Sequence, residues 1–171
     1  TKYRNGDNIT HITTNSDWTS NTSGAYGVYN NDATTYLDSY GLLYNWYAVD
    51  NSSNICPEGW HVPTRDEYDV LSTYLGGNSV AGGKMKETGT EYWNSPNTGA
   101  DNESGFTGLP AGYRAFNSGT YYSLGYYTYF WTSVSHNLNK AKYSILYYNS
   151  SLFSLTNNRK QYGFSVRCLE D

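Results

Sequence analysis

One segment of this sequence has the complete pattern of an α-helix, and it limits the fold class more than any other feature. Thr64 stands three residues before Glu67, which is the spacing of a capping box. Apolar side chains then recur from Tyr68 at the i, i+3 and i+7 positions of a helix with one buried face. A Gly-Gly pair follows and ends the pattern. The sequence therefore predicts a helix from Thr64 to Leu75.

The rest of the chain has the pattern of short strands separated by turns. The predicted strands are Gly105–Leu109, Ala111–Phe116, Tyr126–Val134, Lys142–Tyr148 and Gly163–Leu169. The predicted turns are Asn117–Gly119, His136–Asn139 and Asn157–Asn158. A second, weaker helical pattern covers Val80–Lys86, and Gly41–Val49 fits either a buried strand or a short helix. This combination predicts an α+β fold with small antiparallel sheets, one or two helices and long loops, in one domain spanning residues 1–171.

The composition favours a folded domain that makes few ionic contacts. Only 15% of the residues are charged, whereas 18% are aromatic, including 20 Tyr. Disordered chains have the opposite balance. The net charge is -4, and the 11 Lys and Arg residues are spread thinly along the chain, so a nucleic-acid partner is not predicted. No apolar run approaches the length of a membrane span.

The two cysteines, Cys56 and Cys168, lie far apart and belong to no CxxC pair, so a zinc site is not predicted. Two readings remain open, namely buried thiols or one disulfide bond. The Tyr-, Asn- and Ser-rich composition is typical of extracellular proteins and favours the disulfide. Closing so long a loop would stabilise the fold by about 4 kcal/mol in the chain-entropy description.

The residues that usually carry catalysis form no recognisable motif. The three histidines, His11, His61 and His136, lie outside the nucleophile and metal motifs. His61 is expected to be a packed or turn histidine with a hydrogen-bond partner rather than a base. The oxygen donors around Asn102 lack the spacing of an EF-hand. We therefore predict neither an enzyme nor a cofactor or metal site.

The stretch 145–158, ILYYNSSLFSLTNN, has the aromatic content of a strand and the Asn and Ser content of a loop, and it carries no charge. Ile145, Leu146 and Phe153 are its candidates for the core. The neighbouring Tyr, Asn and Ser side chains are candidates for a contact surface, because Tyr offers a large contact area with little rotamer entropy to lose, while Ser and Asn adapt their hydrogen bonds.

Five stretches of the sequence, taken together and in this order, resemble a known family. They are residues 41–50 (GLLYNWYAVD), 56–65 (CPEGWHVPTR), 82–101 (GGKMKETGTEYWNSPNTGAD), 105–115 (GFTGLPAGYRA) and 163–169 (GFSVRCL). The chain is similar over nearly its whole length to the Fibrobacter succinogenes major paralogous domain, which occurs in bacterial surface proteins and lipoproteins, many from gut Bacteroidetes. The resemblance implies a C-type-lectin-like fold, in which the two chain ends meet in a sheet beside two helices and long loops display a binding surface. It also implies an extracellular location as an outer-membrane lipoprotein, with a lipid anchor in the precursor.

The resemblance also implies roles for individual residues. It supports a disulfide between Cys56 and Cys168, and it makes Trp60, Trp93, Tyr113 and Phe164 candidates for the core. Calcium-dependent lectins of this fold bind sugar through Pro-containing triplets and a Trp-Asn-Asp motif. Here Trp93-Asn94 is followed by Ser95, and neither Pro triplet is present, so calcium-dependent sugar binding is not expected. Both cysteines lie in the structural motifs of the family, which disfavours the chemistry of formylglycine-generating enzymes.

Members of the family resemble the variable proteins of diversity-generating retroelements, in which adenine-directed mutagenesis rewrites Asn-type codons near the C-terminus. Residues 135–158 consist largely of amino acids that an AAC codon can reach by adenine changes. Lys140 and Lys142 cannot be reached in this way and limit the extent of any rewriting. The resemblance therefore implies the hypothesis that this stretch is a diversified binding face.

We therefore predict a surface-displayed ligand-binding module whose partner is a protein or glycan on another cell or a phage. The predicted ligand-binding residues are Tyr122, Tyr127, His136, Asn137, Asn139, Tyr143, Tyr147, Asn149, Ser150, Leu152, Ser154 and Thr156. Two alternatives remain open, namely a calcium-independent carbohydrate-binding adhesin and a structural subunit of a pilus or surface layer.

Overall fold

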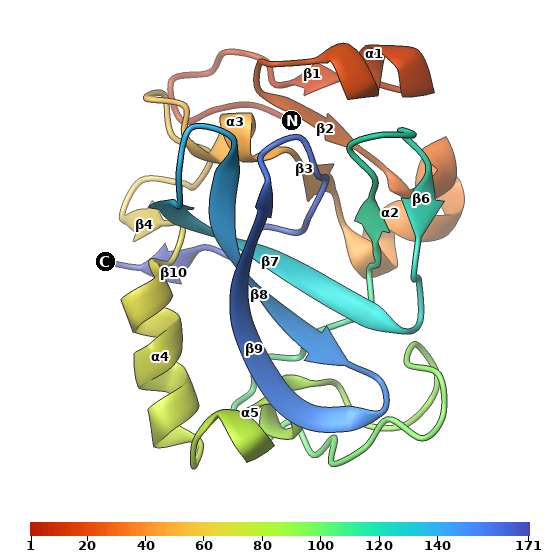
Figure 1. Ribbon diagram of the computed structural model, residues 1–171, viewed down its shortest axis with the longest axis vertical. Coiled ribbons are helices and arrows are strands. Elements are labelled where there is room, and N and C mark those ends of the chain that lie inside the picture. Colours follow the sequence, from red (N-terminus) through yellow and green to blue (C-terminus); the bar gives the residue numbers. More distant parts are fainter.

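The computed structural model describes all 171 residues and has a mixed α+β architecture in which no sheet exceeds three strands, which confirms the predicted class (Figure 1). The helices are α1 (Asn15–Ser20), α2 (Ala33–Tyr40), α3 (Trp46–Val49), α4 (Arg65–Tyr74) and α5 (Asn78–Met85), and Tyr29–Asn31 form a 3-10 turn. The strands are β1 (Thr10–His11), β2 (Ala25–Gly27), β3 (Leu43–Tyr44), β4 (Trp60–His61), β5 (Tyr113–Arg114), β6 (Tyr121–Tyr122), β7 (Tyr127–Ser135), β8 (Lys140–Tyr147), β9 (Ser150–Arg159) and β10 (Leu169–Glu170).

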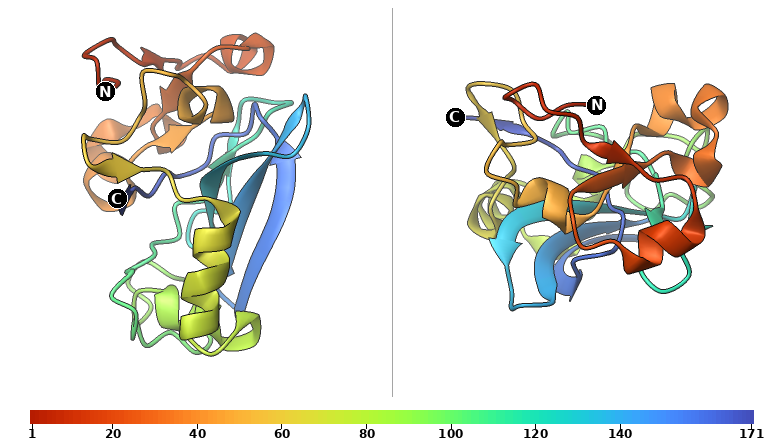
Figure 2. Two further views of the ribbon diagram at one scale, coloured as in Figure 1. Left: turned by 90° about the vertical axis from the view of Figure 1, so that its left-hand side faces the viewer. Right: turned by 90° about the horizontal axis from the view of Figure 1, so that it is seen from above.

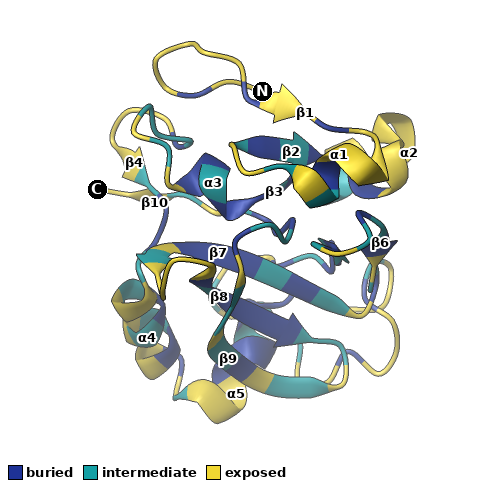
Figure 3. Ribbon diagram, turned by 45° about the horizontal axis from the view of Figure 1, so that its top comes forward, coloured by how far each residue is buried: buried dark blue, intermediate teal, exposed yellow.

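The longest strands, β7, β8 and β9, form one antiparallel sheet in chain order. Ile145 of β8 pairs with Tyr129 of β7 on one side and with Ser154 of β9 on the other. Because side chains alternate between the two faces of a strand, these three residues point to one face, and Leu146 and Phe153 point to the other. The edge strand β9 shows exposed and half-buried segments, whereas β8 is mostly buried (Figure 3).

Helix α4 begins as the sequence predicts. The Thr64 hydroxyl accepts a hydrogen bond from the Glu67 N–H at 3.2 Å, and the Glu67 carboxylate accepts one from the Thr64 N–H at 2.7 Å, which completes the capping box. Helices α4 and α5 lie on one side of the sheet, as the edge-on view shows (Figure 2, left). The buried residues between them and the sheet are Tyr68, Leu75, Ala81, Met85, Trp93, Phe130, Leu146 and Phe153.

Helix α5 packs closely against β9 because two of its residues have no side chain. A Cβ atom on Gly82 would lie 2.3 Å from the carbonyl oxygen of Leu152, and one on Gly83 would lie 2.3 Å from that of Gly99. The Gly-Gly pair that weakened the helical pattern in the sequence is therefore required by packing. The helix spans Asn78–Met85, close to the predicted Val80–Lys86.

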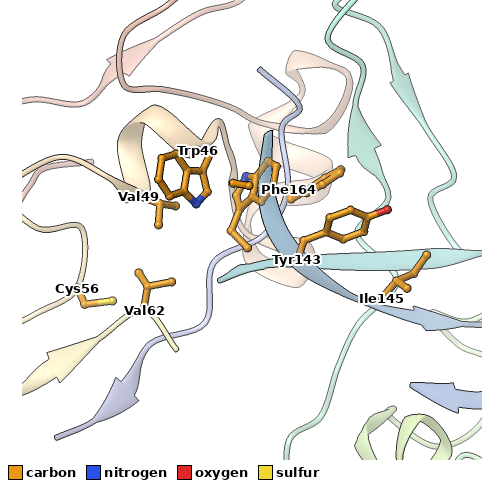
Figure 4. Close-up of a cluster of buried hydrophobic side chains, with 9 residues drawn as sticks. Trp46, Val49, Cys56, Val62, Tyr143, Ile145 and Phe164 are labelled. Carbon is orange, nitrogen blue, oxygen red and sulfur yellow. The ribbon is translucent and has the colours of Figure 1, made fainter. Parts of the chain in front are cut away.

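A second buried cluster lies on the opposite face of the sheet, where α3 and the C-terminal segment cover β7 and β8 (Figure 4). Its members are Trp46, Val49, Cys56, Val62, Trp131, Ala141, Tyr143, Ile145 and Phe164. The two tryptophans of this cluster each form a hydrogen bond through the indole N–H. Trp46 donates to the Thr132 carbonyl at 2.9 Å, and Trp131 donates to the Tyr44 carbonyl at 2.8 Å. The structure joins Cys56 to Cys168 across a sequence separation of 112, with their Cα atoms 5.9 Å apart.

The chain ends do not pair with each other in a sheet, which corrects an expectation drawn from the family resemblance. The C-terminal β10 pairs with β4, whereas β1 pairs in parallel with β2. The N-terminal segment reaches β4 through the Arg4 guanidinium, which donates to the Trp60 carbonyl at 2.6 Å. The Trp60 side chain is 39% exposed because β4 lies at the surface, so its prediction as a core residue was wrong, whereas Trp93 and Phe164 are buried as expected.

Three local predictions also differ from the structure. Five helices form instead of one or two, because α1, α2 and α3 are short helices whose N-termini are capped by the side chains of Thr14, Asp32 and Asn45. Asn157–Asn158 do not turn but lie within β9, where pairing with β8 overrides their preference for turns. Gly105–Leu109 is a loop, and Thr107 in it has a φ of 52°.

No helix is both long and apolar enough to cross a membrane.

A tyrosine-lined sheet face as the candidate binding site

The face of the β7–β8–β9 sheet opposite α4 and α5 carries tyrosines that are partly covered and partly exposed. Helix α3 and the C-terminal segment cover the part of this face around Trp131 and Tyr143, and the rest is free of helices α4 and α5. We call it the tyrosine face and define it by Tyr113, Tyr122, Tyr127, Tyr129, Tyr143, Tyr147 and Tyr162. These residues come from β5, β6, β7, β8 and the segment after β9, so the fold brings together positions that are far apart in the sequence.

Tyr129 lies at the centre of the tyrosine face. Its ring centroid is 5.3 Å from that of Tyr113, 5.8 Å from Tyr143 and 6.3 Å from Tyr127. The ring of Phe164 stacks against Tyr129 at 4.9 Å and belongs to the buried cluster. These separations are those at which aromatic rings attract one another beyond simple burial, so the centre of the face is a packed aromatic unit.

The outer tyrosines, Tyr147, Tyr122 and Tyr162, pack against this centre. Tyr147 lies 5.7 Å from Tyr127, and its ring is nearly perpendicular to it. Tyr122 and Tyr162 both lie 5.7 Å from Tyr113. Tyr122 is 44% exposed, whereas Tyr143 is only 8% exposed. The face therefore has a buried centre and an accessible periphery.

A hollow of about 200 Å³ opens in the tyrosine face. It is lined by Tyr113, Tyr129, Tyr143, Ile145, Asn158, Tyr162 and Phe164. This volume lies below the range of pockets for drug-sized ligands, which is roughly 300–1,000 Å³. The hollow is thus of a size to hold one side chain or one ring, with a single amide and several phenol groups around it and no charged group.

Burial keeps the phenol groups of the tyrosine face uncharged. It raises the pKa of Tyr129, Tyr143 and Tyr113 above the usual value of 10.0 for a tyrosine. Neighbouring phenols raise these pKa values further, and for Tyr143 the Asn158 side chain has a smaller opposite effect. Each hydroxyl group therefore remains protonated at neutral pH, where it can both donate and accept a hydrogen bond.

The C-terminal segment holds Phe164 beneath the tyrosines through its backbone. Phe164 and Tyr44 exchange two hydrogen bonds of 2.8 and 3.0 Å. The next residue, Ser165, donates to the Tyr129 carbonyl at 2.9 Å and accepts from the Trp131 N–H at 3.0 Å. The segment therefore extends the sheet along β7 without depending on the side chains that the tyrosine face exposes.

Arg114 fixes the β5–β6 hairpin, which carries Tyr113 and Tyr122. Its side chain is fully buried, and its guanidinium donates to the carbonyls of Gly119 at 2.8 Å and Thr14 at 3.1 Å, as well as to that of Ile12. It also lies over the ring of Trp18, 4.3 Å from the centroid. With these backbone acceptors and an aromatic partner, Arg114 ties the hairpin to the N-terminal part of the chain.

Lys86 fixes the turn between β8 and β9. Its side chain is fully buried, and its ammonium donates to the carbonyls of Tyr147 at 2.8 Å, Thr98 at 2.9 Å and Ser150 at 3.2 Å. Burial lowers the pKa of Lys86 to about 8, so the group is still mostly protonated at neutral pH. Because every acceptor is a main-chain carbonyl, the turn is held by contacts that do not depend on its own side chains.

The structure divides the predicted ligand-binding residues into two groups. The first group lies on or beside the tyrosine face and consists of Tyr122, Tyr127, Tyr143, Tyr147, Asn149, Ser150, Leu152, Ser154 and Thr156. Its β9 residues occupy alternate positions of that strand, so their side chains point to the same face of the sheet as Tyr143 and Tyr147. The second group, His136, Asn137 and Asn139, lies in the exposed β7–β8 turn. This turn and Asn149 are at opposite ends of β8, which at about 3.3 Å per residue spans roughly 26 Å.

Sequence reasoning missed three members of the tyrosine face. Tyr129 could have been found, because it follows Tyr127 at the two-residue spacing of one strand face. Tyr113 was predicted to lie in the core, and it is in fact half-buried at the edge of the hollow. No local pattern marks Tyr162, because it reaches the face through the long-range pairing of Gly163 with Arg114.

His61 is partly exposed and lies between two carboxylates. Its Nδ1 is 2.6 Å from Asp171 Oδ1, and its Nε2 is 2.9 Å from Glu67 Oε1. The hydrogen bond to Asp171, and to a smaller extent the one to Glu67, raises the pKa of His61.

Glu103, in the loop considered for calcium, forms an ion pair with Lys84 at 2.8 Å. No group of three or more His, Cys, Asp or Glu side chains gathers in an arrangement that could hold a metal ion.

A larger hollow, of about 460 Å³, lies away from the tyrosine face between α4 and the segment 167–169. Its walls are mainly apolar and include Leu71, Tyr74, Phe106 and Leu169. None of the predicted ligand-binding residues lines it. The tyrosine face, where aromatic rings and hydrogen-bonding groups converge, is therefore the candidate binding site.

Comparison with known families is consistent with this architecture. The sequence matches the family described as the Fibrobacter succinogenes major domain over residues 1–170, and the chain therefore belongs to that family. Searches of curated proteins and of solved structures gave no match.

Proposed function

We propose that this domain is a non-catalytic ligand-binding module that contacts its ligand through the tyrosine face of a C-type-lectin-like scaffold. One observation carries the proposal. Helices α4 and α5 cover one face of the β7–β8–β9 sheet, while the other face presents seven interacting tyrosines, four of which line a hollow of about 200 Å³. A core face has no need of so many hydroxyl groups, whereas a contact surface uses them.

The chemistry of the tyrosine face is that of a protein-binding surface. Tyrosine supplies a large rigid contact area and a hydrogen-bonding hydroxyl, and it is enriched at the centres of interfaces. Ser150, Ser154 and Thr156 of β9 lie beside these rings and supply small adaptable hydrogen-bonding groups. The face itself carries no charge, so binding does not require the desolvation of an ion. The partner that we favour is therefore a protein on another cell or a phage.

The C-type-lectin-like assignment is part of the proposal and rests on the family resemblance. Two helices beside the main sheet, a long irregular segment between α5 and β5 and a C-terminal strand that returns to β4 support it. The Cys56–Cys168 disulfide supports an extracellular location, because disulfides persist in oxidising compartments. We propose display on the outer membrane of a bacterium as a lipoprotein.

We also propose that part of the tyrosine face is diversified, as in the variable proteins of diversity-generating retroelements. The contacts of Lys86 to main-chain carbonyls support this, because side chains in the β8–β9 turn can change while its backbone stays fixed. Sequencing the locus in related strains tests the idea. Substitutions should occur at outward positions such as Tyr147 and Ser154 and spare the neighbouring Leu146 and Phe153, with a reverse transcriptase and a template repeat nearby.

A binding experiment tests the main proposal. A yeast-displayed library of a small three-helix protein with one randomised face would be sorted against the folded domain. Most selected binders should lose affinity for Tyr127→Ala and Tyr147→Ala and keep it for Tyr74→Ala, which truncates a tyrosine that is 85% exposed on α4. Binders that ignore both changes on the tyrosine face would contradict the proposal.

Two alternatives make different predictions. The ring-sized hollow with Asn158 at its edge favours a calcium-independent carbohydrate-binding adhesin. That reading predicts binding on a glycan array that persists in EDTA and is lost in Tyr129→Ala. A structural pilus or surface-layer subunit predicts self-association at micromolar concentration, and a monomer by size exclusion with light scattering would argue against it.

A further inference from the structure

The part of the chain that builds the tyrosine face contains no acidic residue. Between Ser104 and Leu169 there is no Asp or Glu. The same stretch contains six cationic residues, namely Arg114, Lys140, Lys142, Arg159, Lys160 and Arg167. All acidic residues precede Ser104 except Glu170 and Asp171. The whole chain has a net charge of -4, yet this region is positively charged and the remainder is negatively charged. Such a charge asymmetry favours the approach of partners whose charge is opposite to that of the region they meet.

Four of these cations gather at one end of the sheet, where β8 begins and β9 ends. We call Lys140, Lys142 and Arg159 the basic end, whereas Lys160, which follows β9, is buried with its ammonium 4.3 Å over the Trp46 ring. Lys140 stands directly opposite Arg159 in the register, and like charges in this position destabilise a sheet. The structure contains four ion pairs, and none involves a residue of the basic end. Nothing within the chain therefore compensates this repulsion through an ion pair.

Arg159 links the basic end to the edge of the tyrosine face. The Arg159 guanidinium lies 4.9 Å over the ring of Phe116, which is 5.1 Å from the ring of Tyr162 at the edge of the hollow. The exposed β7–β8 turn, with His136 and Asn139, lies at the same end of the sheet. The turn and Arg159 thus lie at one rim of the aromatic centre, whereas the alternation along β8 places Lys140 and Lys142 on the face of Leu146.

We infer that the natural partner is a protein with an acidic contact surface, which places one side chain in the hollow and presents carboxylates to Arg159 and, past the end of the sheet, to the exposed Lys140. This inference rests on the proposed function. An uncharged aromatic centre with charge confined to the rim is the anatomy of a protein–protein interface. Rim charges chiefly accelerate association and exclude partners of the wrong sign. A nucleic acid would instead require cations along the path of its phosphates, whereas these cations cluster at one end.

The test uses the same displayed library and sorts it separately against the wild-type domain and the double variant Lys140→Glu/Arg159→Glu. Binders of the wild type should carry about twice the Asp and Glu content of the unsorted library and bind the double variant about tenfold more weakly at low salt. Sorting against the double variant should instead enrich Lys and Arg. Lys2→Glu, an exposed charge reversal elsewhere on the chain, should change affinity less than about twofold.

The remaining controls separate the possible failures. The neutral pair Lys140→Gln/Arg159→Gln should fold like the wild type and weaken binding by an intermediate amount. Binders that depend on Tyr127 and Tyr147, but show no acidic enrichment and tolerate the charge reversal, overturn the acidic-partner inference and leave the proposed function standing. Binders that ignore the tyrosines overturn both. Tyrosine-dependent, salt-sensitive binding of single-stranded DNA with a Kd below about 1 μM would replace the protein partner with a nucleic acid.

Discussion

The two faces of the β7–β8–β9 sheet are built from the same strands but have opposite characters. The face toward α4 and α5 buries Phe130, Leu146 and Phe153, which are at most 6% exposed. The other face leaves Tyr127 and Tyr147 partly exposed. Since neighbouring residues in a strand point to opposite faces, each strand contributes to a sealed core and to an accessible surface at the same time.

This difference separates stability from recognition along one stretch of sequence. Removing a side chain from the closed face leaves a cavity that the packed helices cannot fill. Removing one from the open periphery leaves a space that water can enter, and the backbone there is held by Lys86 and by the segment around Phe164. The comparison predicts that closed-face residues such as Phe153 and peripheral open-face residues such as Ser154 respond differently to mutation.

The largest effect should come from Phe153→Ala on the closed face. Its side chain is 1% exposed and packs beside Tyr68 and Leu146, so truncation should lower the free energy of unfolding by about 3–5 kcal/mol. Ser154→Ala, one residue along on the open face, should change it by less than about 0.5 kcal/mol. Urea unfolding followed by tryptophan fluorescence measures both. Similar costs for the two variants would show that the faces are not energetically distinct.

Lys86→Met should have the next largest effect, because it removes the donor from three carbonyls. Leaving these buried groups unpaired should cost about 2–3 kcal/mol. Lys84→Met removes the same charge from the solvent-screened ion pair with Glu103, where the loss of stability should be much smaller. Amide hydrogen exchange of residues 147–152 should rise in Lys86→Met only. Unchanged exchange would show that the β8–β9 turn does not depend on Lys86.

A smaller effect, and one on binding rather than stability, should follow from Tyr147→Ala on the open face. Losing this ring should weaken a selected binder about tenfold, or about 1.4 kcal/mol, while the free energy of unfolding changes by less. Biolayer interferometry with Tyr74→Ala as the matched control measures the loss. If both tyrosine variants bound equally well, the open face would be a passive surface.

The sequence predicted the parts of this fold that local patterns determine. The capping box placed α4, and the runs of aromatic and β-branched residues located β7 and β8. Ile145, Leu146 and Phe153 were expected to be buried, and they are, although Ile145 faces the hollow and the other two face the helices. Short helices such as α2 were missed because their only signal was a single capping side chain.

The candidate site was predictable only within the sheet. Tyr127 and Tyr147 belong to adjacent strands, and a pattern of strands and turns suffices to bring them together. Tyr113 and Tyr162 join the site through the pairing of Arg114 with Gly163, a contact between distant segments that no local pattern announces. The absence of acidic residues after Ser104 was visible in the sequence. The sequence alone could not show that two of the cations in this region lie side by side, because that depends on the strand register, which pairs Lys140 with Arg159.

The smallest expected effect concerns His61, where β4 meets α4 on the closed side of the sheet. Its pKa is raised above 6.5 by Asp171 and Glu67, so the folded state holds the proton more tightly than the unfolded state. The stabilisation is therefore fully present below about pH 6.5 and is lost as the pH rises through the folded-state pKa. Because these groups are partly exposed, His61→Gln should cost less than about 1 kcal/mol near pH 6 and almost nothing near pH 9. Ser154→Ala on the open face removes no ionisable group, so its small cost in urea unfolding should be the same at both values. A His61→Gln cost that did not change with pH would mean that the imidazole acts there by packing alone.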